Sequence, residues 1–290
     1  MKIAVHDADK TDFPNLALMK ISAWHKSQGD TVVWYDALWS STYDKVYSSK
    51  VFTFTPNEKL HGSVEYGGIG YGEEKATVLL HNDAHGMCPD YDLYGVCASY
   101  GFLTRGCPNK CSWCIVPGKE GNIRPENDIE DFLRHKSAVL MDNNVLAHEH
   151  GIRQIEKIIK LGVRVDFNQG LDARLIDDGV SRLLSKVKWL HPIRLACDSQ
   201  SQMKHIQRAV TLLRWHNATP RNYFVYVLIK EIDDALERIK FLKGLMLDPF
   251  AQPYIDFEGK VEVTQEQRDL ARWVNHKAIF KSVEFENYSA

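Results

Sequence analysis

The sequence predicts an α/β protein in which a small N-terminal α/β region at residues 1–95 precedes a partial barrel at residues 96–260 and a helical extension at residues 261–290. Two observations predict this arrangement. Residues 2–35 follow the order strand, helix, glycine turn, strand. From about residue 98, short apolar runs alternate with segments whose apolar residues recur at helical spacing, which is typical of a parallel sheet curling towards a barrel.

In the N-terminal region we expect strands at residues 2–6, 31–35 and 46–55, with a helix at 16–28. The glycine-rich stretch 66–72 does not lead from a strand into a helix, so it does not fit a phosphate-binding loop. We expect it to form a flexible turn or an approach of the backbone to a neighbouring domain.

Six strands and their helices are expected in the partial barrel. The strands lie at residues 100–104, 138–141, 163–167, 193–197, 223–229 and 254–257, and the helices at 128–135, 151–161, 178–187, 204–216 and 234–245. A further, polar helix is expected at 265–276. Right-handed crossovers place the carboxyl ends of all the strands at one end of such a fold, where the chemistry is found.

Composition is ordinary for a soluble globular protein, with 44% hydrophobic and 26% charged residues among 290. The formal net charge of −2 gives no strong field to attract polyanions. The longest apolar run, residues 223–229, is far shorter than the roughly 18 residues that span a bilayer. We therefore expect a cytoplasmic protein without a membrane span, whose six cysteines are metal ligands or buried thiols rather than disulfides.

Three of these cysteines form the most informative motif of the chain. Cys107, Cys111 and Cys114 are spaced C-x3-C-x2-C directly after an expected strand. Thiolates are strong ligands of iron–sulfur clusters, and three of them satisfy three irons of a [4Fe–4S] cluster and leave the fourth open. Two alternatives stay open: a zinc site with a fourth ligand from elsewhere, and a cluster held by four cysteines.

The segment from Arg105 to Pro117 resembles the radical S-adenosylmethionine (radical SAM) superfamily motif, C-x3-C-x-aromatic-C, with Trp113 as the aromatic residue. The local sequence of this segment most resembles that of the tRNA methylthiotransferases and of the cobalamin-dependent branch. The resemblance covers residues 98–257 and implies a TIM-like partial (βα)6 barrel, while the N-terminal region resembles the Rossmann-like domain that precedes many such barrels. His6-Asp7-Ala8-Asp9 does not match the cobalamin-ligand motif Asp-x-His-x-x-Gly, so we expect no cobalamin.

The resemblance implies that S-adenosylmethionine (SAM) binds the open iron of a [4Fe–4S] cluster. The reduced cluster then cleaves SAM to methionine and a 5′-deoxyadenosyl radical, which abstracts hydrogen from a substrate. An electron donor of the flavodoxin or ferredoxin type is implied. RNA, peptides and small molecules remain open as substrates. Two other functions remain open: that of a non-catalytic or electron-transfer iron–sulfur protein, and that of a zinc-stabilised nucleic-acid-binding module.

By the same resemblance, Trp113 lies beside the adenine, and the polar residues after the second barrel strand, Asp142, Asn143 and Asn144, bind the SAM amino group. They stand where Gly-Gly-Glu is the commoner form.

Gln169 and Arg174 follow the third barrel strand, and Asp198 follows the fourth. Arg174 is suited to pairing with the SAM carboxylate, and Asp198 to accepting hydrogen bonds from a ribose hydroxyl. Local alternatives are a helix-capping loop around Asp172 and an N-cap at Asp198.

Weaker candidates complete the list. Lys230 and Glu231 end the fifth barrel strand. His81, His85 and Cys88 have the spacing of metal ligands but lack a fourth, so ordinary loop residues are favoured.

Overall fold

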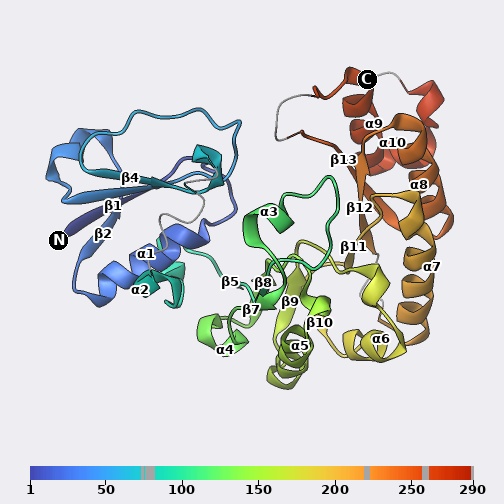
Figure 1. Ribbon diagram of the computed structural model, residues 1–290, viewed down its shortest axis with the longest axis horizontal. Coiled ribbons are helices and arrows are strands. Elements are labelled where there is room, and N and C mark those ends of the chain that lie inside the picture. Colours follow the sequence, from blue (N-terminus) through green and yellow to red (C-terminus); the bar gives the residue numbers. More distant parts are fainter. Residues whose placement is uncertain (73–74, 76–81, 219–222, 257–260, 289–290) are drawn as a thin grey trace. The chain divides into compact units, whose positions relative to one another are not determined.

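The computed structural model describes the chain except residues 73–74, 76–81, 219–222, 257–260 and 289–290 (Figure 1). It is a mixed α/β protein with parallel sheets. The chain divides into two compact units. Unit 1 comprises Met1–Gly101 with Glu130–His135, and unit 2 comprises Phe102–Ile129 with Lys136–Ala290. None of the described helices combines the length and apolar character that crossing a bilayer requires.

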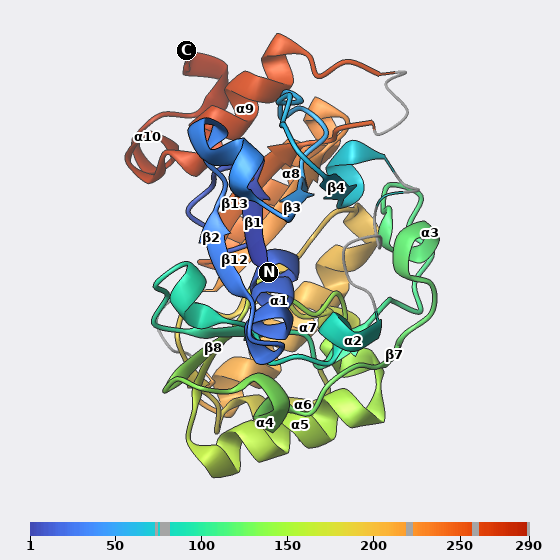
Figure 2. The same cartoon turned by 90° about the vertical axis from the view of Figure 1, so that its left-hand side faces the viewer.

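Unit 1 is built on a parallel sheet in the order β2-β1-β3-β4 (Figure 2). Its strands are β1 (Lys2–Asp7), β2 (Thr31–Trp34), β3 (Lys45–Ser49) and β4 (Val64–Gly67), and α1 (Leu16–Ser27) connects the first two. The expected strand 46–55 ends early, because the Asp9 carboxylate accepts the backbone N–H groups of Val51 and Phe52 and takes them out of the sheet.

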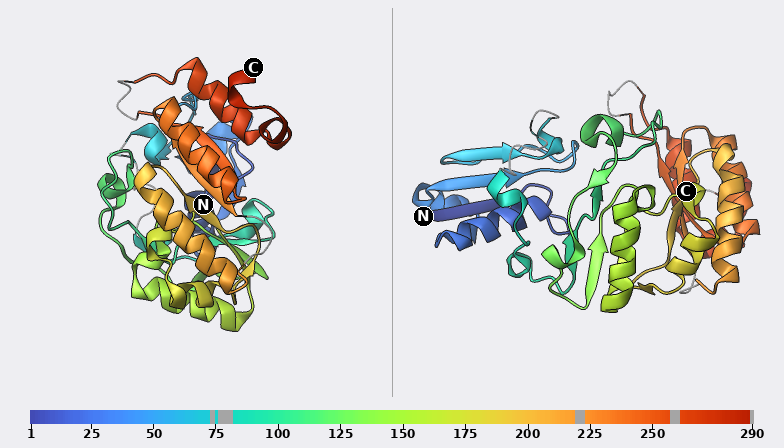
Figure 3. Two further views of the ribbon diagram at one scale, coloured as in Figure 1. Left: turned by 90° about the vertical axis from the view of Figure 1, so that its right-hand side faces the viewer. Right: turned by 60° about the horizontal axis from the view of Figure 1, so that its bottom comes forward.

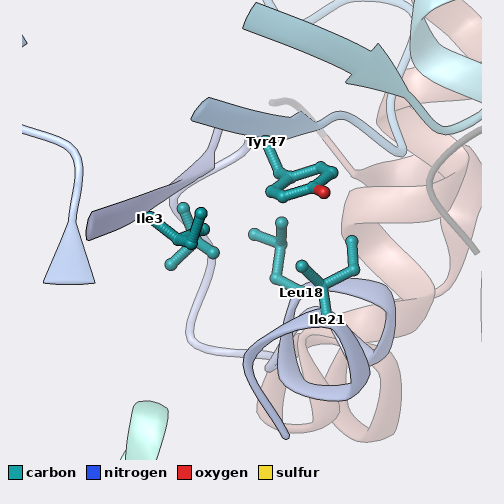
Figure 4. Packing of buried hydrophobic residues seen from close by; sticks show 5 residues of the cluster. Ile3, Leu18, Ile21 and Tyr47 are labelled. Atoms are coloured by element: carbon teal, nitrogen blue, oxygen red, sulfur yellow. The ribbon is translucent and has the colours of Figure 1, made fainter. Parts of the chain in front are cut away.

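Helix α1 covers one face of this sheet. Ile3 and Val5 of β1 and Tyr47 of β3 pack against Leu18 and Ile21 of α1, all of them buried (Figure 4). The Asn15 side chain caps the helix by accepting the N–H of Leu18, and its amide donates to Ser49.

The glycine-rich stretch of unit 1 makes a close backbone approach to another segment of the same unit, and not to a neighbouring domain among the described residues. It includes the end of β4 and the turn η2 (Ile69–Tyr71). Gly68 has φ +95°, and a Cβ there would lie 2.3 Å from the carbonyl oxygen of Lys50. The remaining short elements of the unit are η1 (Ala37–Thr42), α2 (Asn82–His85), η4 (Tyr91–Leu93) and β5 (Ser99–Gly101).

Unit 2 contains two parallel sheets. One includes β8 (Ser137–Leu140), β9 (Arg164–Phe167) and β10 (Lys188–Trp189), and the other is β11 (Arg194–Ala196), β12 (Phe224–Ile229) and β13 (Asp248–Pro253). Leu171, four residues after the end of β9, forms an isolated parallel bridge with Leu195 of β11. Two short antiparallel strands, β6 (Thr104–Arg105) and β7 (Arg124–Pro125), flank the cysteine loop.

The main helices of unit 2 return the chain from each strand to the next. They are α5 (Glu149–Leu161), α6 (Asp178–Leu184), α7 (Gln200–Trp215) and α8 (Ile232–Gly244), and the chain ends with α9 (Gln265–Asn275), α10 (Lys277–Ser282) and η7 (Phe285–Asn287). Figure 3 shows α7 and α8 on the outside of the second sheet. Two short 3-10 turns, η5 (Val145–Ala147) and η6 (Ala173–Leu175), follow β8 and β9, and α3 (Val116–Glu120) follows the cysteines.

Besides the strand at 46–55, three expected elements differ clearly from the structure. The strand expected at 100–104 is divided between β5 and β6, because the Asp142 carboxylate binds the backbone N–H groups between them. The helix expected at 128–135 is only α4 (Ile129–Phe132), since Ser99 accepts the N–H groups of Arg134 and His135. The last strand lies at β13 rather than 254–257, of which residue 257 is outside the described residues. Its two prolines hid it, and an edge strand tolerates them.

Arg238 of α8 is fully buried and ties its helix to the second sheet. Its guanidinium donates to the carbonyl oxygens of Cys197 and Leu228 and pairs with Asp234 at 2.6 Å. We expect Arg238→Ala to lower the free energy of unfolding by about 3 kcal/mol, because both carbonyls lose their donor inside the protein. Urea unfolding measures the loss.

The matched control is Arg182→Ala, which removes an exposed arginine that also pairs with an aspartate four residues before it. Its cost should be below about 0.5 kcal/mol. Equal losses for the two variants would contradict the role assigned to Arg238.

Candidate functional site

A cavity of about 890 Å³ lies within unit 2, where the strand ends of both sheets meet the cysteine loop. Nine of the ten residues expected at the site line it: Cys107, Cys111, Trp113, Cys114, Asn143, Asn144, Gln169, Arg174 and Asp198. The exception is Asp142. Its volume falls within the range that is typical of small-molecule binding sites.

Asp142 is buried and anchors the start of the cysteine loop. Its carboxylate accepts the N–H groups of Leu103 and Thr104 at 2.5–3.2 Å and the Thr104 hydroxyl at 2.7 Å. Burial raises the pKa of Asp142 to about 6, against the lowering effect of these donors. We therefore assign Asp142 to holding the loop, in place of the direct contact with a cofactor that its position suggested.

Glu120 holds the other side of the same loop. Its carboxylate accepts the Gly106 N–H at 3.0 Å and the Asn143 amide at 2.7 Å, and it pairs with Arg105 at 3.0 Å. Cys107 donates its own N–H to the Gly121 carbonyl. The loop is therefore fixed to the end of β8 through two carboxylates, one on each side.

Gly106, directly before the first cysteine, is required by the backbone. Its φ is +79°, and a Cβ there would lie 2.3 Å from the carbonyl oxygen of Asn122. No other residue type fits this position without moving the segment that closes the loop.

The three cysteines differ in their surroundings. Cys107 and Cys111 are partly buried and Cys114 is exposed. Burial raises the pKa of the Cys111 thiol, opposed by the nearby charge of Arg174, and desolvation also raises the pKa of Cys114. Any metal or cluster bound through these thiols would have to displace their protons.

Asn144 has the one buried side-chain oxygen or nitrogen without a hydrogen-bond partner among the described residues, its Oδ1. The residue is 3% exposed and lines the cavity. A buried acceptor without a donor is costly, so this oxygen fits a ligand that brings an N–H or O–H group.

Arg174 is already engaged in a bidentate pair with Asp172, at 2.7 and 2.8 Å. Burial acts to raise the pKa of Asp172, but the hydrogen bonds and charge of Arg174 outweigh it and lower that pKa. Asp172 also accepts the backbone N–H of Arg174, so the local capping role considered for it is present too.

Trp113 projects from the cysteine loop towards β12 and β13. The Lys230 ammonium lies 5.0 Å from the centre of its ring and 4.6 Å from that of Tyr254. Both rings line the cavity, so this cation–π arrangement connects the loop to the ends of two strands. Glu231 begins α8 without a side-chain cap.

Asp198 and Gln169 complete the expected set. Asp198 accepts the Leu228 N–H at 3.1 Å, and burial raises its pKa. It lies one residue before the N-cap of α7, which is Ser199. Gln169 is exposed and contacts Asn168.

The remaining candidate cysteines and histidines do not line this cavity in the part of the chain that the structure describes. Cys88, Cys97 and His85 belong to unit 1, Cys197 is buried directly after β11, and His81 is outside the described residues. His205, which the sequence did not single out, does line the cavity. Within the described ranges, no three His, Cys, Asp or Glu side chains are grouped to hold a single metal ion.

Two contributors were not anticipated. Asn109 lies within the cysteine motif and contacts Cys107 and Asp172, and its place between two cysteines was an available signal. Glu120 carried no signal, since its role depends on the turn that brings it back to Gly106.

No family model and no curated protein matches this chain.

Acidification provides a test of Asp142. Its pKa of about 6 lies above the ordinary value of 3.8, so the folded protein binds this proton more tightly than the unfolded chain. The wild type therefore gains stability as the pH falls from about 7 to about 4, which Asp142→Asn cannot. The unfolding free energy of the wild type minus that of Asp142→Asn should rise by about 2.4 kcal/mol, measured by urea unfolding across this range.

Asp178→Asn is the control, because the hydrogen bond from His216 holds the pKa of Asp178 below its ordinary value. For that pair the difference should stay level or shrink on acidification. A difference for Asp142→Asn that does not grow would refute the account of its burial.

Proposed function

We propose that this chain is a radical SAM enzyme. In this proposal unit 2 is a partial barrel of that type, Cys107, Cys111 and Cys114 bind a [4Fe–4S] cluster, and the cavity binds SAM with part of a substrate. The observation that carries it is that all three cysteines line one cavity with the polar residues that follow β8, β9 and β11. The two parallel sheets and the Leu171–Leu195 bridge support the barrel.

The residues present fit such a cluster and cofactor. Three thiols on one loop supply three ligands, and no fourth cysteine lines the cavity among the described residues. The orphaned Oδ1 of Asn144 suits an amino group, as the family resemblance implies for this position. When bound, the cluster and SAM supply reductive cleavage of a sulfonium and hydrogen abstraction.

The chain's own residues position these groups. Asp142 and Glu120 fix the cysteine loop, Asn144 offers an acceptor, and Asp198 offers a partly buried carboxylate to hydroxyl groups. Because Arg174 is paired with Asp172, its remaining N–H groups are what it can present to a carboxylate. Unpaired thiols suit a reducing cytoplasm, where a flavodoxin or ferredoxin would supply the electron.

Anaerobic reconstitution with iron and sulfide tests the ligands. The wild type should take up four irons per chain, with a visible charge-transfer band, and each single Cys→Ala change at 107, 111 or 114 should remove the band or most of it. Cys97→Ala, at an exposed cysteine of unit 1, is the matched control and should behave as wild type. The proposal would be contradicted if the wild-type protein took up no cluster.

SAM binding distinguishes an enzyme from an electron-transfer protein. Added SAM should change the electron paramagnetic resonance spectrum of the reduced cluster, and dithionite should then yield 5′-deoxyadenosine. Asp198→Ala should keep the cluster but need about tenfold more SAM for the same change, because a charge-assisted hydrogen bond from a partly buried carboxylate is lost. Asp177→Ala, an exposed N-cap of α6, should need no more SAM than wild type. A spectrum of the reduced cluster that does not change when SAM is added would favour an electron-transfer protein over an enzyme.

A further inference from the structure

Two asparagine side chains converge on one cysteine of the loop. Asn109 lies inside the cysteine motif and Asn144 follows β8. Their amide nitrogens lie 3.5 and 3.6 Å from the Cys107 sulfur. Both nitrogens also lie 3.1 Å from the same carboxylate oxygen, Oδ2 of Asp172.

The carboxylate decides which way the two amides face. Asp172 accepts hydrogen bonds but does not donate when ionised, so each asparagine must turn its nitrogen towards it. An amide nitrogen carries two hydrogens, and with one on the carboxylate the other is directed to the sulfur. Asp172 is fixed in turn by both Nε and Nη2 of Arg174, and its side chain is only 11% exposed.

The arrangement singles out Cys107. Among the described residues, no side-chain amide contacts the sulfur of Cys111 or Cys114. Hydrogen bonds to ligand sulfurs stabilise the more negative, reduced state of an iron–sulfur cluster and so raise its reduction potential.

We infer that Asp172 is a positioning residue that aims the amides of Asn109 and Asn144 at the Cys107 sulfur and thereby sets the reduction potential of the cluster. This inference rests on the proposed function. In it, Asp172 and Asn109 act through the Cys107 sulfur and not through contact with SAM.

The test is an anaerobic redox titration of the reconstituted chain without SAM, followed by electron paramagnetic resonance. Asn109→Ala removes one donor from a partly buried side chain. We expect the equilibrium between reduced and oxidised cluster to shift about tenfold towards the oxidised form, which lowers the midpoint potential by about 59 mV for one electron. Asn168→Ala removes another asparagine of the same cavity and should leave the potential unchanged.

A double-mutant cycle isolates the contribution of Asp172. Asp172→Asn alters the charge near the cluster, but that effect is common to both legs of the cycle and cancels. In the Asp172→Asn background the amide of Asn109 is no longer fixed, so Asn109→Ala should shift the equilibrium by about threefold or less. Equal shifts in the two backgrounds would overturn the role of Asp172.

The possible failures are distinguishable. A wild type that binds a cluster and responds to SAM, with an unchanged potential in Asn109→Ala, overturns this inference and leaves the proposed function intact. A wild type that binds no cluster overturns both.

Discussion

The capture of two backbone N–H groups by the Asp142 carboxylate is the constraint on which the site depends. It ends one strand, begins the cysteine loop and fixes that loop to the end of β8. Asp142 joins the segment that carries Gly106 and Cys107 to the segment that carries Asn143, so the positions of these residues depend on it. A buried carboxylate that meets three donors is a rigid connection, since loosening it leaves several polar groups unpaired at once.

Much of the site could be predicted because it depends on local order along the chain. Cysteine spacing and the rule that strand ends converge predicted part of the site, and the family resemblance supplied Trp113, Asn143 and Asn144. Together they named nine side chains that line one cavity. The α/β class followed from periodicity for the same reason. In contrast, Asp142 was placed at the right strand end but was expected to bind the SAM amino group. Sequence alone does not show that the backbone N–H groups of Leu103 and Thr104 use its carboxylate oxygens.

What escaped prediction depends on contacts between distant segments. Glu120 reaches Gly106 only because a turn of α3 brings it back. The strand β13 was hidden by Pro249 and Pro253, whose missing N–H groups matter less at a sheet edge. The division of the expected barrel strands into two sheets is likewise not a matter of pattern, since periodicity reports which face is buried and not where a ladder breaks.

That break has a mechanical consequence. Between the sheets of unit 2, the Leu171–Leu195 bridge, the ion pair of Arg194 with Asp166 and the hydrogen bond from the Tyr226 hydroxyl to the Asn168 carbonyl stand where a continuous ladder would have many hydrogen bonds. We therefore expect this seam to bend more easily than an unbroken barrel wall, in which every strand would have to be strained.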